Sequence, residues 1–382
     1  MSSSSSDPLS VPTRRCWRIA HSEASNGWGG QEHRVFNELA GFRDRSSRVA
    51  LIAEPTSGVA KRVAAAQMEL VPTRFKRVHF IPELIHLRNW LFQNRIEVLN
   101  THSSKDGWLL GIAGRLAKTP LIIRSKHIDV DYPSPKTSRH AYATVSDHVI
   151  TTSGKIRAKM IETMKLDESR IDVIATGVDV TKFTAEGPKA DLGLRDNGHP
   201  VVGMVSVLRS WKGHALLFRA ASILRDRGMP LRIVIVGGGA PVENFSKFAV
   251  AEGAEDLVTF AGHQENVAEV LRALDLLVIP STKHEGIPQI GLQGLSTQVP
   301  IVGSDCGGIP EIVRDGQTGR IFPTNDAEAF ANRIEEALKK KERSRELAQA
   351  GRRMVEAEYS TDRMFERLEA LYARYLGPSK RH

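Results

Sequence analysis

Cysteine and long apolar runs are the scarcest features of this chain. Only Cys16 and Cys306 occur among 382 residues, so neither a disulfide framework nor a cysteine-rich metal site is expected. No apolar run approaches the roughly 18 residues that a membrane-spanning helix needs. The first 14 residues also lack the hydrophobic segment of a signal peptide. We therefore expect a cytoplasmic protein whose Ser-rich residues 1–14 form a disordered tail.

Aromatic residues are also few, at 6% of the chain, and positive charge is unevenly distributed. Residues 1–190 contain 28 Lys and Arg against 19 Asp and Glu, a net charge of +9, whereas the remainder contains 25 of each. A basic half suggests an anionic partner such as a lipid surface, a phosphorylated acceptor or nucleic acid. The low aromatic content does not favour nucleic acid. A basic surface that serves solubility alone is the alternative.

The length favours two domains, because a single core usually stops growing before 382 residues. Both halves alternate apolar strand-like runs with amphipathic helical segments, the pattern of doubly wound parallel sheets. The composition shifts to Gly, Pro, Asp and Lys between Thr184 and Gly198, which predicts a linker. We expect domains at residues 15–185 and 186–360, followed by a final helix and tail at residues 361–382.

The stretch from Ile279 to Val313 contains the main candidate site. It starts at the end of a buried strand, passes through a polar turn with Glu285, and enters a helix predicted from about Pro288 to Ser296. Ligands bind at the carboxyl ends of strands in open α/β sheets, and a turn into a helix presents N–H groups to anions. Gln293 lies eight positions after Glu285, roughly 12 Å along a helix, which is about the reach from sugar to ribose in a nucleotide-sugar.

Backbone amides and cations are also expected at the carboxyl ends of other predicted strands. Gly307 and Gly308 follow the next predicted strand and should leave amides uncovered. Arg209 and Lys212 follow another strand, where two cations would neutralise a leaving diphosphate without a metal. Their alternative is a role as surface cations.

A glycine turn that contains Gly29 and Gly30 links the first predicted strand to a helix, where the backbone can approach a phosphate closely. It is not the dinucleotide pattern G-x-G-x-x-G. A tight turn without a ligand role is the alternative.

Two histidines and two aspartates end predicted strands of the first half. His102 and His127 should face the same edge as the glycine turn, with satisfied surface histidines as the alternative. Asp129 and Asp131 form an Asp-x-Asp pattern, but two carboxylates alone make a weak metal site. No metal is therefore expected.

Residues 74–95 form a basic, helix-like segment that follows a strand at residues 47–53 and a linker region. The segment could lie in a membrane interface with its Arg and Lys side chains on anionic lipid. A core-facing stripe is the alternative, and Pro82 interrupts the helical pattern. Its apolar residues are Val78, Phe80, Ile81, Leu84, Leu87, Leu91 and Phe92.

The Glu-x7-Gln stretch resembles the donor-site signature of the retaining glycosyltransferase family 4, in which two glutamates flank seven residues. Glu285 matches the first glutamate, and Gln293 replaces the second. The resemblance extends from about Arg18 to Leu376. It implies the α/β GT-B fold: two Rossmann-like doubly wound parallel-sheet domains that face each other across a cleft, with the C-terminal helix crossing back to the first domain.

The resemblance also assigns residue roles. Lys212 and, at a less usual spacing, Arg209 would neutralise the leaving diphosphate, while Gln293 would bind ribose hydroxyls. His127 matches a histidine beside the transferred sugar. The remaining positions implied are Glu285, Gly286 and Ile287 at the donor sugar, Gly29 and Gly30 at the diphosphate, and Gly262 and His263 near the base.

The function implied is transfer of a sugar, with retention, from a UDP- or GDP-type donor to a glycan or glycolipid acceptor. Cell-surface polysaccharide or lipopolysaccharide synthesis is the expected context, with contact to the inner face of an anionic membrane and without cofactor or nucleic acid. Gln293 motivates one alternative, a non-catalytic nucleotide-sugar-binding protein. A GT-B epimerase that acts on the nucleotide-sugar is the other.

Overall fold

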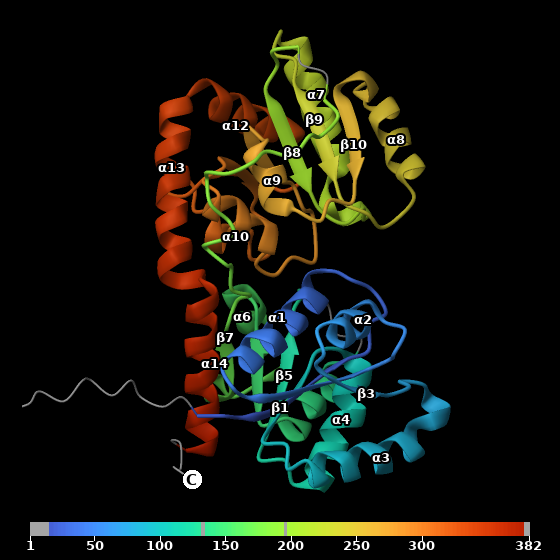
Figure 1. The fold of residues 1–382 in the computed structure, drawn as a ribbon. Helices are drawn as coiled ribbons and strands as arrows, with labels where there is room; N and C mark the ends of the chain where they lie inside the picture. Colours follow the sequence, from blue (N-terminus) through green and yellow to red (C-terminus); the bar gives the residue numbers. More distant parts are fainter. Residues whose placement is uncertain (1–14, 131–133, 195–196, 378–382) are drawn as a thin grey trace, which may run out of the picture. The chain divides into compact units, whose positions relative to one another are not determined.

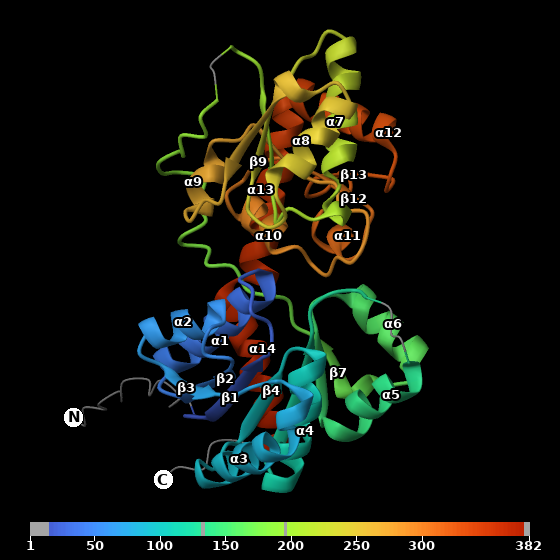
Figure 2. The ribbon, with the colours of Figure 1, turned by 90° about the vertical axis from the view of Figure 1, so that its right-hand side faces the viewer.

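The computed structural model describes residues 15–130, 134–194 and 197–377, and these residues form two sheets (Figure 1 and Figure 2). The expected tail at residues 1–14 and Asp131 lie outside the described residues. Contacts divide the chain into two compact units. The first comprises Met1–Ser125, His140–Val149 and Leu368–His382; the second comprises Lys126–Arg139 and Ile150–Arg367.

The first sheet has seven strands in the described residues, in the order β3-β2-β1-β4-β5-β6-β7. The pairs β1–β2, β2–β3, β1–β4 and β4–β5 are parallel. The strands are β1 (Arg18–Glu23), β2 (Arg48–Ala53), β3 (Glu69–Pro72), β4 (Val98–Thr101), β5 (Leu121–Lys126), β6 (His148–Thr151) and β7 (Ile171–Val173). The helices between them are α1 (Gly30–Asp44), α2 (Gly58–Ala65), α3 (Phe80–Gln93), α4 (Ser104–Ala117), α5 (Pro135–His140) and α6 (Gly154–Met164).

Strand β2 shows how this sheet is buried on both faces. Ala50 and Ile52 point into a core cluster with Leu87 and Leu91 of α3. Leu51 points to the opposite face and is also fully buried, as the two-residue period of a strand requires. Helices α1 and α2 contact β2 as well. Helices on both faces of a parallel sheet make this half doubly wound.

Helix α3 corrects one expectation. Because it begins at Phe80, Pro82 lies in its first turn, where a missing N–H removes no intrahelical hydrogen bond. Pro82 therefore does not interrupt the helix. The linker region expected between residues 53 and 74 contains α2 and β3 instead.

The last helix, α14 (Thr361–Leu376), contributes to the first unit through its C-terminal half. Tyr372 is fully buried, and its ring centroid lies 5.4 Å from that of Phe42 and 5.7 Å from that of Trp17. The end of the chain thus packs against the beginning of the same unit, as the family resemblance implies.

The second sheet has six strands in the described residues, in the order β10-β9-β8-β11-β12-β13, all paired in parallel. The strands are β8 (Val201–Val205), β9 (Arg232–Val236), β10 (Val258–Gly262), β11 (Leu276–Ile279), β12 (Ile301–Ser304) and β13 (Arg320–Phe322). The helices are α7 (His214–Asp226), α8 (Val242–Ala251), α9 (Val267–Arg272), α10 (Gln289–Ser296), α11 (Ile309–Ile312), α12 (Ala327–Lys339) and α13 (Lys341–Met354).

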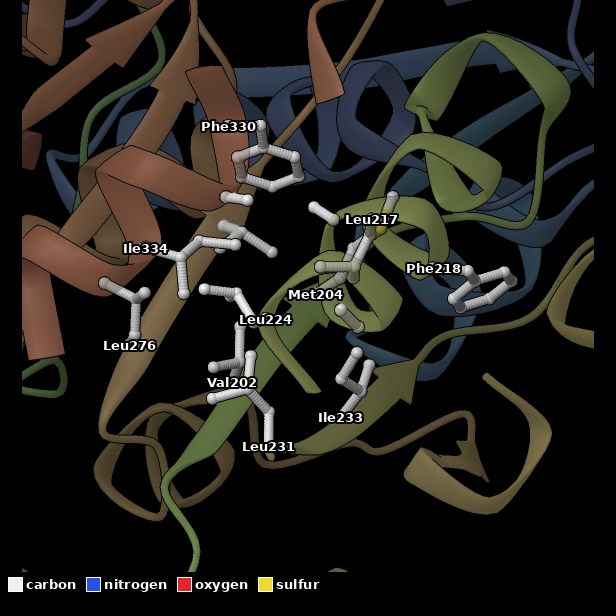
Figure 3. Close-up of a cluster of buried hydrophobic side chains, with 14 of the residues drawn as sticks. Val202, Met204, Leu217, Phe218, Leu224, Leu231, Ile233, Leu276, Phe330 and Ile334 are labelled. Atoms are coloured by element: carbon white, nitrogen blue, oxygen red, sulfur yellow. The ribbon is translucent and has the colours of Figure 1, made fainter. Parts of the chain in front are cut away.

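Alternate residues of β9 enter two different cores. Ile233 and Ile235 pack in a cluster with Leu217 of α7 and Phe330 of α12 (Figure 3). The intervening Val234 belongs to the cluster on the other face, which α9 and α10 cover. The sheet is therefore enclosed on both faces, and its polar chemistry is confined to the strand ends and turns.

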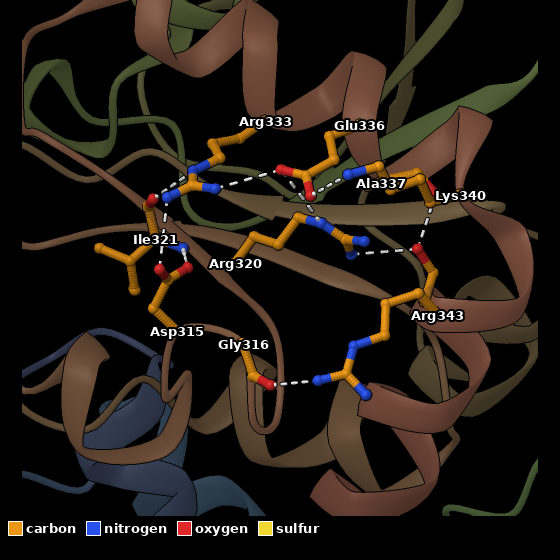
Figure 4. Close-up of polar contacts among 10 residues, drawn as sticks. Asp315, Gly316, Arg320, Ile321, Arg333, Glu336, Ala337, Lys340 and Arg343 are labelled. Atoms are coloured by element: carbon orange, nitrogen blue, oxygen red, sulfur yellow. Dashed lines mark hydrogen bonds and ion pairs between the residues drawn. The ribbon is translucent and has the colours of Figure 1, made fainter.

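A polar network connects β13, α12 and α13 (Figure 4). Arg320 is only 3% exposed, and its guanidinium donates to Ser344 Oγ at 3.0 Å and lies 3.7 Å from the Glu336 carboxylate. Arg333 pairs with Glu336 at 3.1 Å and with Asp315 at 3.3 Å. Burial lowers the pKa of Arg320, and these partners offset that burial.

The predicted linker packs on the second core over its described part. Arg272 donates to the carbonyl oxygens of Thr184 at 2.9 Å and Pro188 at 3.2 Å, and Leu192 is buried in the core cluster. Within the described ranges, no helix is long and apolar enough to cross a membrane.

Candidate functional site

Lys212 and Glu285 form an ion pair in the second unit, between Lys212 Nζ and Glu285 Oε1. Lys212 follows β8 and Glu285 follows β11, which are neighbouring strands. Glu285 is only 6% exposed and also accepts a hydrogen bond from Ser281 Oγ at 2.7 Å. We predicted from the sequence that both residues lie at strand carboxyl ends. The structure also brings them into direct contact. No sequence pattern singled out Ser281.

The two turns are held together by their backbones. Thr282 N donates to Trp211 O at 2.7 Å. Gly213 has φ +88°, and a Cβ there would lie 1.9 Å from Pro280 O, so only glycine allows this approach. The position of Lys212 beside Glu285 is therefore set by rigid main-chain contacts.

The turn after β12 packs directly on Glu285. Gly308 N donates to Glu285 O at 3.3 Å, and a Cβ on Gly307 would lie 2.2 Å from the same oxygen. We expected the amides of both glycines to be uncovered; for Gly308 this is wrong, because its N–H already has a carbonyl partner. The glycines are needed here for close packing.

The main chain at His127 lies against Gly286. The His127 carbonyl oxygen accepts a hydrogen bond from Thr152 Oγ1 at 3.0 Å. A Cβ on Gly286 would lie 2.6 Å from that oxygen and 2.4 Å from Thr152 Oγ1. The structure therefore brings His127, which follows β5, close to the residue after Glu285. The next residue, Ile287, packs its side chain against the core.

Arg209 is exposed, and its guanidinium lies 5.0 Å from the Trp211 ring centroid. Trp211 in turn meets His284 edge-on at 5.6 Å. A stacked guanidinium has fewer rotamers to lose on binding an anion. Arg209 thus lies one turn from Lys212, beside the same site.

The remaining expected donor residues of this unit lie on separate elements. Gln293 is half-buried at the fifth position of α10, which begins at Gln289 as expected. Gly262 ends β10 with φ +66°, and its carbonyl oxygen accepts from Gly237 N at 2.8 Å. His263 follows it and is exposed.

The glycine turn belongs to the first unit. Gly29 is the N-cap of α1, and its N–H donates to Glu32 Oε2 at 2.8 Å, so this amide already has a partner. A Cβ on Gly30 would meet no atom within 4 Å. Packing therefore does not require glycine at position 30.

Buried titratable groups lie at the carboxyl end of β1, and the sequence pattern did not reveal them. His102 directly follows β4 and so lies at the expected carboxyl edge of the sheet, but it is only 4% exposed and its Nε2 lies 2.9 Å from His21 Nδ1, so it is not a surface histidine. Burial lowers the pKa of His21 to about 4. Burial, followed by the charge of Asp106, raises the pKa of Glu23 to about 8. Burial also raises the pKa of Asp106.

Among the described residues, no group of three His, Cys, Asp or Glu side chains could hold a metal ion. Asp129 Oδ1 instead accepts from Lys159 Nζ at 2.6 Å.

Sequence models of two glycosyltransferase families match the chain. The model described as "Glycosyl transferases group 1" covers residues 191–354, and the model described as "Glycosyltransferase Family 4" covers residues 28–182. Together they span most of both sheets.

Curated relatives agree with these matches. A "D-inositol 3-phosphate glycosyltransferase" of Rhodococcus erythropolis is 30% identical over 306 residues, which cover 71% of this chain and 69% of the relative. A "UDP-Gal:alpha-D-GlcNAc-diphosphoundecaprenol alpha-1,3-galactosyltransferase" of Escherichia coli is 27% identical over 283 residues, 69% of this chain and 73% of the relative.

Solved structures share the fold. A glycosyltransferase from Rickettsia africae superposes with a TM-score of 0.84 at 17% identity, over 95% of this chain and 100% of that chain. The Anabaena protein HepE, solved with UDP and glucose, gives a TM-score of 0.80 at 18% identity, over 94% and 99%. Two Rossmann-like parallel sheets with these neighbours make the fold GT-B. By its family matches and by the identity and coverage of its relatives, this chain belongs to the group 1 family of glycosyl transferases.

Proposed function

We propose that this protein transfers a sugar from a nucleoside-diphosphate sugar to an acceptor hydroxyl, with retention of anomeric configuration and without a metal. The observation that carries the proposal is the Lys212–Glu285 ion pair at the ends of β8 and β11, with Gly286 beside it. The family match supports glycosyltransferase activity, and the donor class and stereochemistry belong to the proposal.

Lys212 acts on the leaving group. As the glycosidic bond breaks, negative charge grows on the diphosphate, and an ammonium group preorganised by Glu285 stabilises that charge electrostatically. Arg209 adds a second cation on the same turn. The departing phosphate takes the proton of the acceptor hydroxyl as the new bond forms on the same face of the sugar.

The other expected residues are assigned to the donor. Glu285, the main chain at Gly286 and Ile287, and His127 bind the sugar; Gln293 binds the ribose hydroxyls. Gly262 and His263 lie near the base, and Gly29 and Gly30 approach the diphosphate. The contact between the His127 carbonyl and Gly286 supports placing both at the sugar.

The donor base is proposed to be uracil. The name of the Escherichia coli relative includes UDP-galactose, and HepE was solved with UDP. The same relative's name includes a polyprenol-linked acceptor, which supports a glycan or glycolipid acceptor in cell-surface polysaccharide or lipopolysaccharide synthesis.

A panel of UDP- and GDP-sugars incubated with purified protein tests the proposal. Nucleotide release from at least one donor is expected, and NMR of a transferred product should show the anomeric configuration of the donor sugar. Interconversion of the donor without nucleotide release would instead identify an epimerase. Binding without either reaction would identify a nucleotide-sugar-binding protein. The Lys247→Ala variant, which changes an exposed lysine of α8, serves as the matched control.

Contact with an anionic membrane is proposed through α3 in the first unit. Ile81, Ile85 and Phe92 recur at helical spacing and are 57–61% exposed, and Val78 precedes them at 82%. Arg88 lies on the same face, with its guanidinium 5.4 Å from the Phe92 ring centroid. An exposed apolar stripe flanked by basic residues fits a bilayer surface that contains anionic lipid.

Sedimentation with vesicles tests this contact. Wild-type protein should bind phosphatidylglycerol vesicles more tightly than phosphatidylcholine vesicles, and Ile81→Ser/Ile85→Ser should weaken binding several-fold. Val250→Ser on α8, a position 61% exposed, is the control and should bind as wild type does. Equal binding of both lipids, or of both variants, would contradict the contact.

A further inference from the structure

A polar cavity of about 500 Å³ lies beside Glu285 in the second unit. Its walls come from turns after β11, β12 and β13 and from α6, and they include Lys155, Lys159, Lys283, Cys306 and Thr324. This volume falls within the roughly 300–1,000 Å³ of small-molecule sites. Cys306 and Gly307 connect the cavity to the site, because Gly307 packs on Glu285.

The strand order places the cavity beyond the sugar end of the proposed donor site. Along the edge of the second sheet, the expected base loop follows β10, Lys212 follows β8 and Glu285 follows β11. The cavity walls that belong to this sheet follow β11, β12 and β13, on the opposite side of Glu285 from β10. A donor with its base near β10 and its sugar at Glu285 leaves this side of the edge for the acceptor.

The acidic groups of the cavity already have partners. Asp129 accepts from Lys159 at 2.6 Å, and Asp305 accepts from Thr324 N at 2.8 Å. Nearby Glu311 accepts from the backbone N–H groups of Gly154 at 2.9 Å and Lys155 at 3.0 Å. The side chains of Lys155 and Lys283, in contrast, have neither ion pair nor hydrogen bond within the part of the chain that the structure describes.

We propose that this cavity binds a phosphoryl group of the acceptor, held by Lys155 and Lys283. The inference rests on the proposed transferase function and names the chemical class of its acceptor. A phosphomonoester carries about −1.5 to −2 charge at pH 7 and three strong acceptor oxygens. Two ammonium groups that have no partner among the described residues match that charge, and Lys159 is already paired with Asp129.

Calorimetry with glycerol 3-phosphate, on protein saturated with UDP, tests the site. Lys155→Ala/Lys283→Ala should weaken the phosphate affinity at least about tenfold more than it weakens the UDP affinity, because each lost charge-assisted contact costs about tenfold. Lys155→Arg/Lys283→Arg keeps both charges and should retain most of the affinity. Lys247→Ala should bind glycerol 3-phosphate as wild type does.

Asp129→Asn provides a change in the opposite direction. It removes the carboxylate that neutralises Lys159 and adds a third available cation, so the affinity for glycerol 3-phosphate should rise several-fold. Unchanged affinity in the double alanine variant, or equal loss in Lys247→Ala, would overturn the proposal.

Cys306 can report where the phosphate binds. In a Cys16→Ser background it is the only cysteine of the chain, and it is half-buried in the cavity wall. Burial, followed by the charge of Glu285, raises the pKa of its thiol, so alkylation by N-ethylmaleimide is measured at pH 8. Glycerol 3-phosphate should slow alkylation of the UDP-saturated protein, and this protection should be lost in Lys155→Ala/Lys283→Ala. Absence of protection in the parent would overturn the proposal.

Two further comparisons separate the possible outcomes. Vesicles that contain phosphatidic acid distinguish a lipid-linked phosphate from a soluble one, because Lys155→Ala/Lys283→Ala should weaken binding to these vesicles only if the cavity accepts a lipid-linked phosphate. Failure of the transferase proposal would appear as absent UDP binding and absent nucleotide release in the wild type. Failure of the phosphate site would appear with both of those activities intact.

Discussion

The carboxylate of Glu285 after β11 and the carboxyl group of Glu23, the last residue of β1, are both buried at strand ends, but they have different partners. Glu285 contacts the ammonium group of Lys212. Glu23 accepts instead from Ser25 N at 2.8 Å and Gln31 Nε2 at 2.5 Å, with the charge of Asp106 nearby. Because neutral donors do not balance a buried charge, the pKa of Glu23 rises to about 8. The second edge should therefore respond to loss of a cation, and the first to pH.

The largest expected effect is that of Lys212→Ala. Loss of the cation that we propose stabilises the leaving diphosphate should lower kcat about 10²–10³-fold, by analogy with other electrostatic transition-state contacts. Initial rates of nucleotide release measure this, with Lys247→Ala as the control. Activity within tenfold of wild type would contradict the role of Lys212.

Protein stability provides a second readout at the same pair. Lys212→Ala leaves Glu285 buried without its cation, so Lys212→Ala/Glu285→Ala should unfold at a higher temperature than the single variant. A lower unfolding temperature for the double variant would mean that the two charges do not depend on each other.

At the first edge, Glu23→Gln should make stability less dependent on pH. The pKa of Glu23 is raised from 4.5 to about 8, so between these values the folded state retains a proton that the unfolded chain has lost. The associated stability is fully present below pH 4.5 and is lost as pH rises to 8. The glutamine side chain of Glu23→Gln does not ionise. The free energy of unfolding of this variant should therefore exceed that of wild type by at most about 5 kcal/mol at pH 8.

Urea unfolding at pH 6.5 and pH 8 measures this difference. The pKa of His21 is lowered from 6.5 to about 4, so its contribution to stability is lost as pH falls below 6.5. Measurements between pH 6.5 and pH 8 therefore avoid most of the contribution of His21. The raised pKa of Asp106 has the same sign as that of Glu23 and is common to both proteins. The exposed Glu255→Gln is the control, and an equal loss of stability in wild type and Glu23→Gln would refute the prediction.

Alanine substitutions at Gly286 and Gly30 compare the packing of the two strand-end sites. Gly286→Ala introduces a Cβ within 2.6 Å of the His127 carbonyl oxygen and should cost about 1–3 kcal/mol of stability. Gly30→Ala introduces one into open space and should leave stability unchanged or slightly higher. Thermal unfolding compares them; weaker UDP binding by a stable Gly30→Ala variant would support its proposed place at the diphosphate.

The smallest effect is expected at Gln293. Gln293→Glu restores the carboxylate of the family signature, and a charge-assisted hydrogen bond to ribose should tighten UDP binding about fivefold, or about 1 kcal/mol. Calorimetry with UDP measures the change. Weaker binding would indicate that Gln293 does not contact the ribose.

Strong periodic patterns predicted their elements well. The last helix, Thr361–Leu376, begins where the final helix and tail were predicted at residues 361–382, because its apolar residues repeat with helical period over sixteen positions. The helix after Glu285 begins at Gln289, next to the predicted Pro288. Helix α2 and strand β3 were missed, because eight and four residues are too short to establish a period.

The hydrogen-bond partners of strand-end residues were predicted less well than the positions of those residues. Gly308 was expected to offer a free amide, and its N–H instead bonds to Glu285 O. His102 lies at the carboxyl end of β4 as expected, but its contact there with His21 was not predicted. A hydrogen-bond partner that is distant in the sequence leaves no trace in local spacing.

The sequence alone determined the alternation of strands and helices, because the spacing of apolar residues along the chain differs between a helix and a strand. That alternation also determined which polar residues stand at the carboxyl ends of strands. The tertiary structure alone decided that Lys212 contacts Glu285, 73 positions away in the chain, and that Asp129 pairs with Lys159. It also decided that the side chains of Lys155 and Lys283 have no partner among the residues that the structure describes. Electrostatic interactions depend on distance and burial, and only the packing of turns from neighbouring strands sets these.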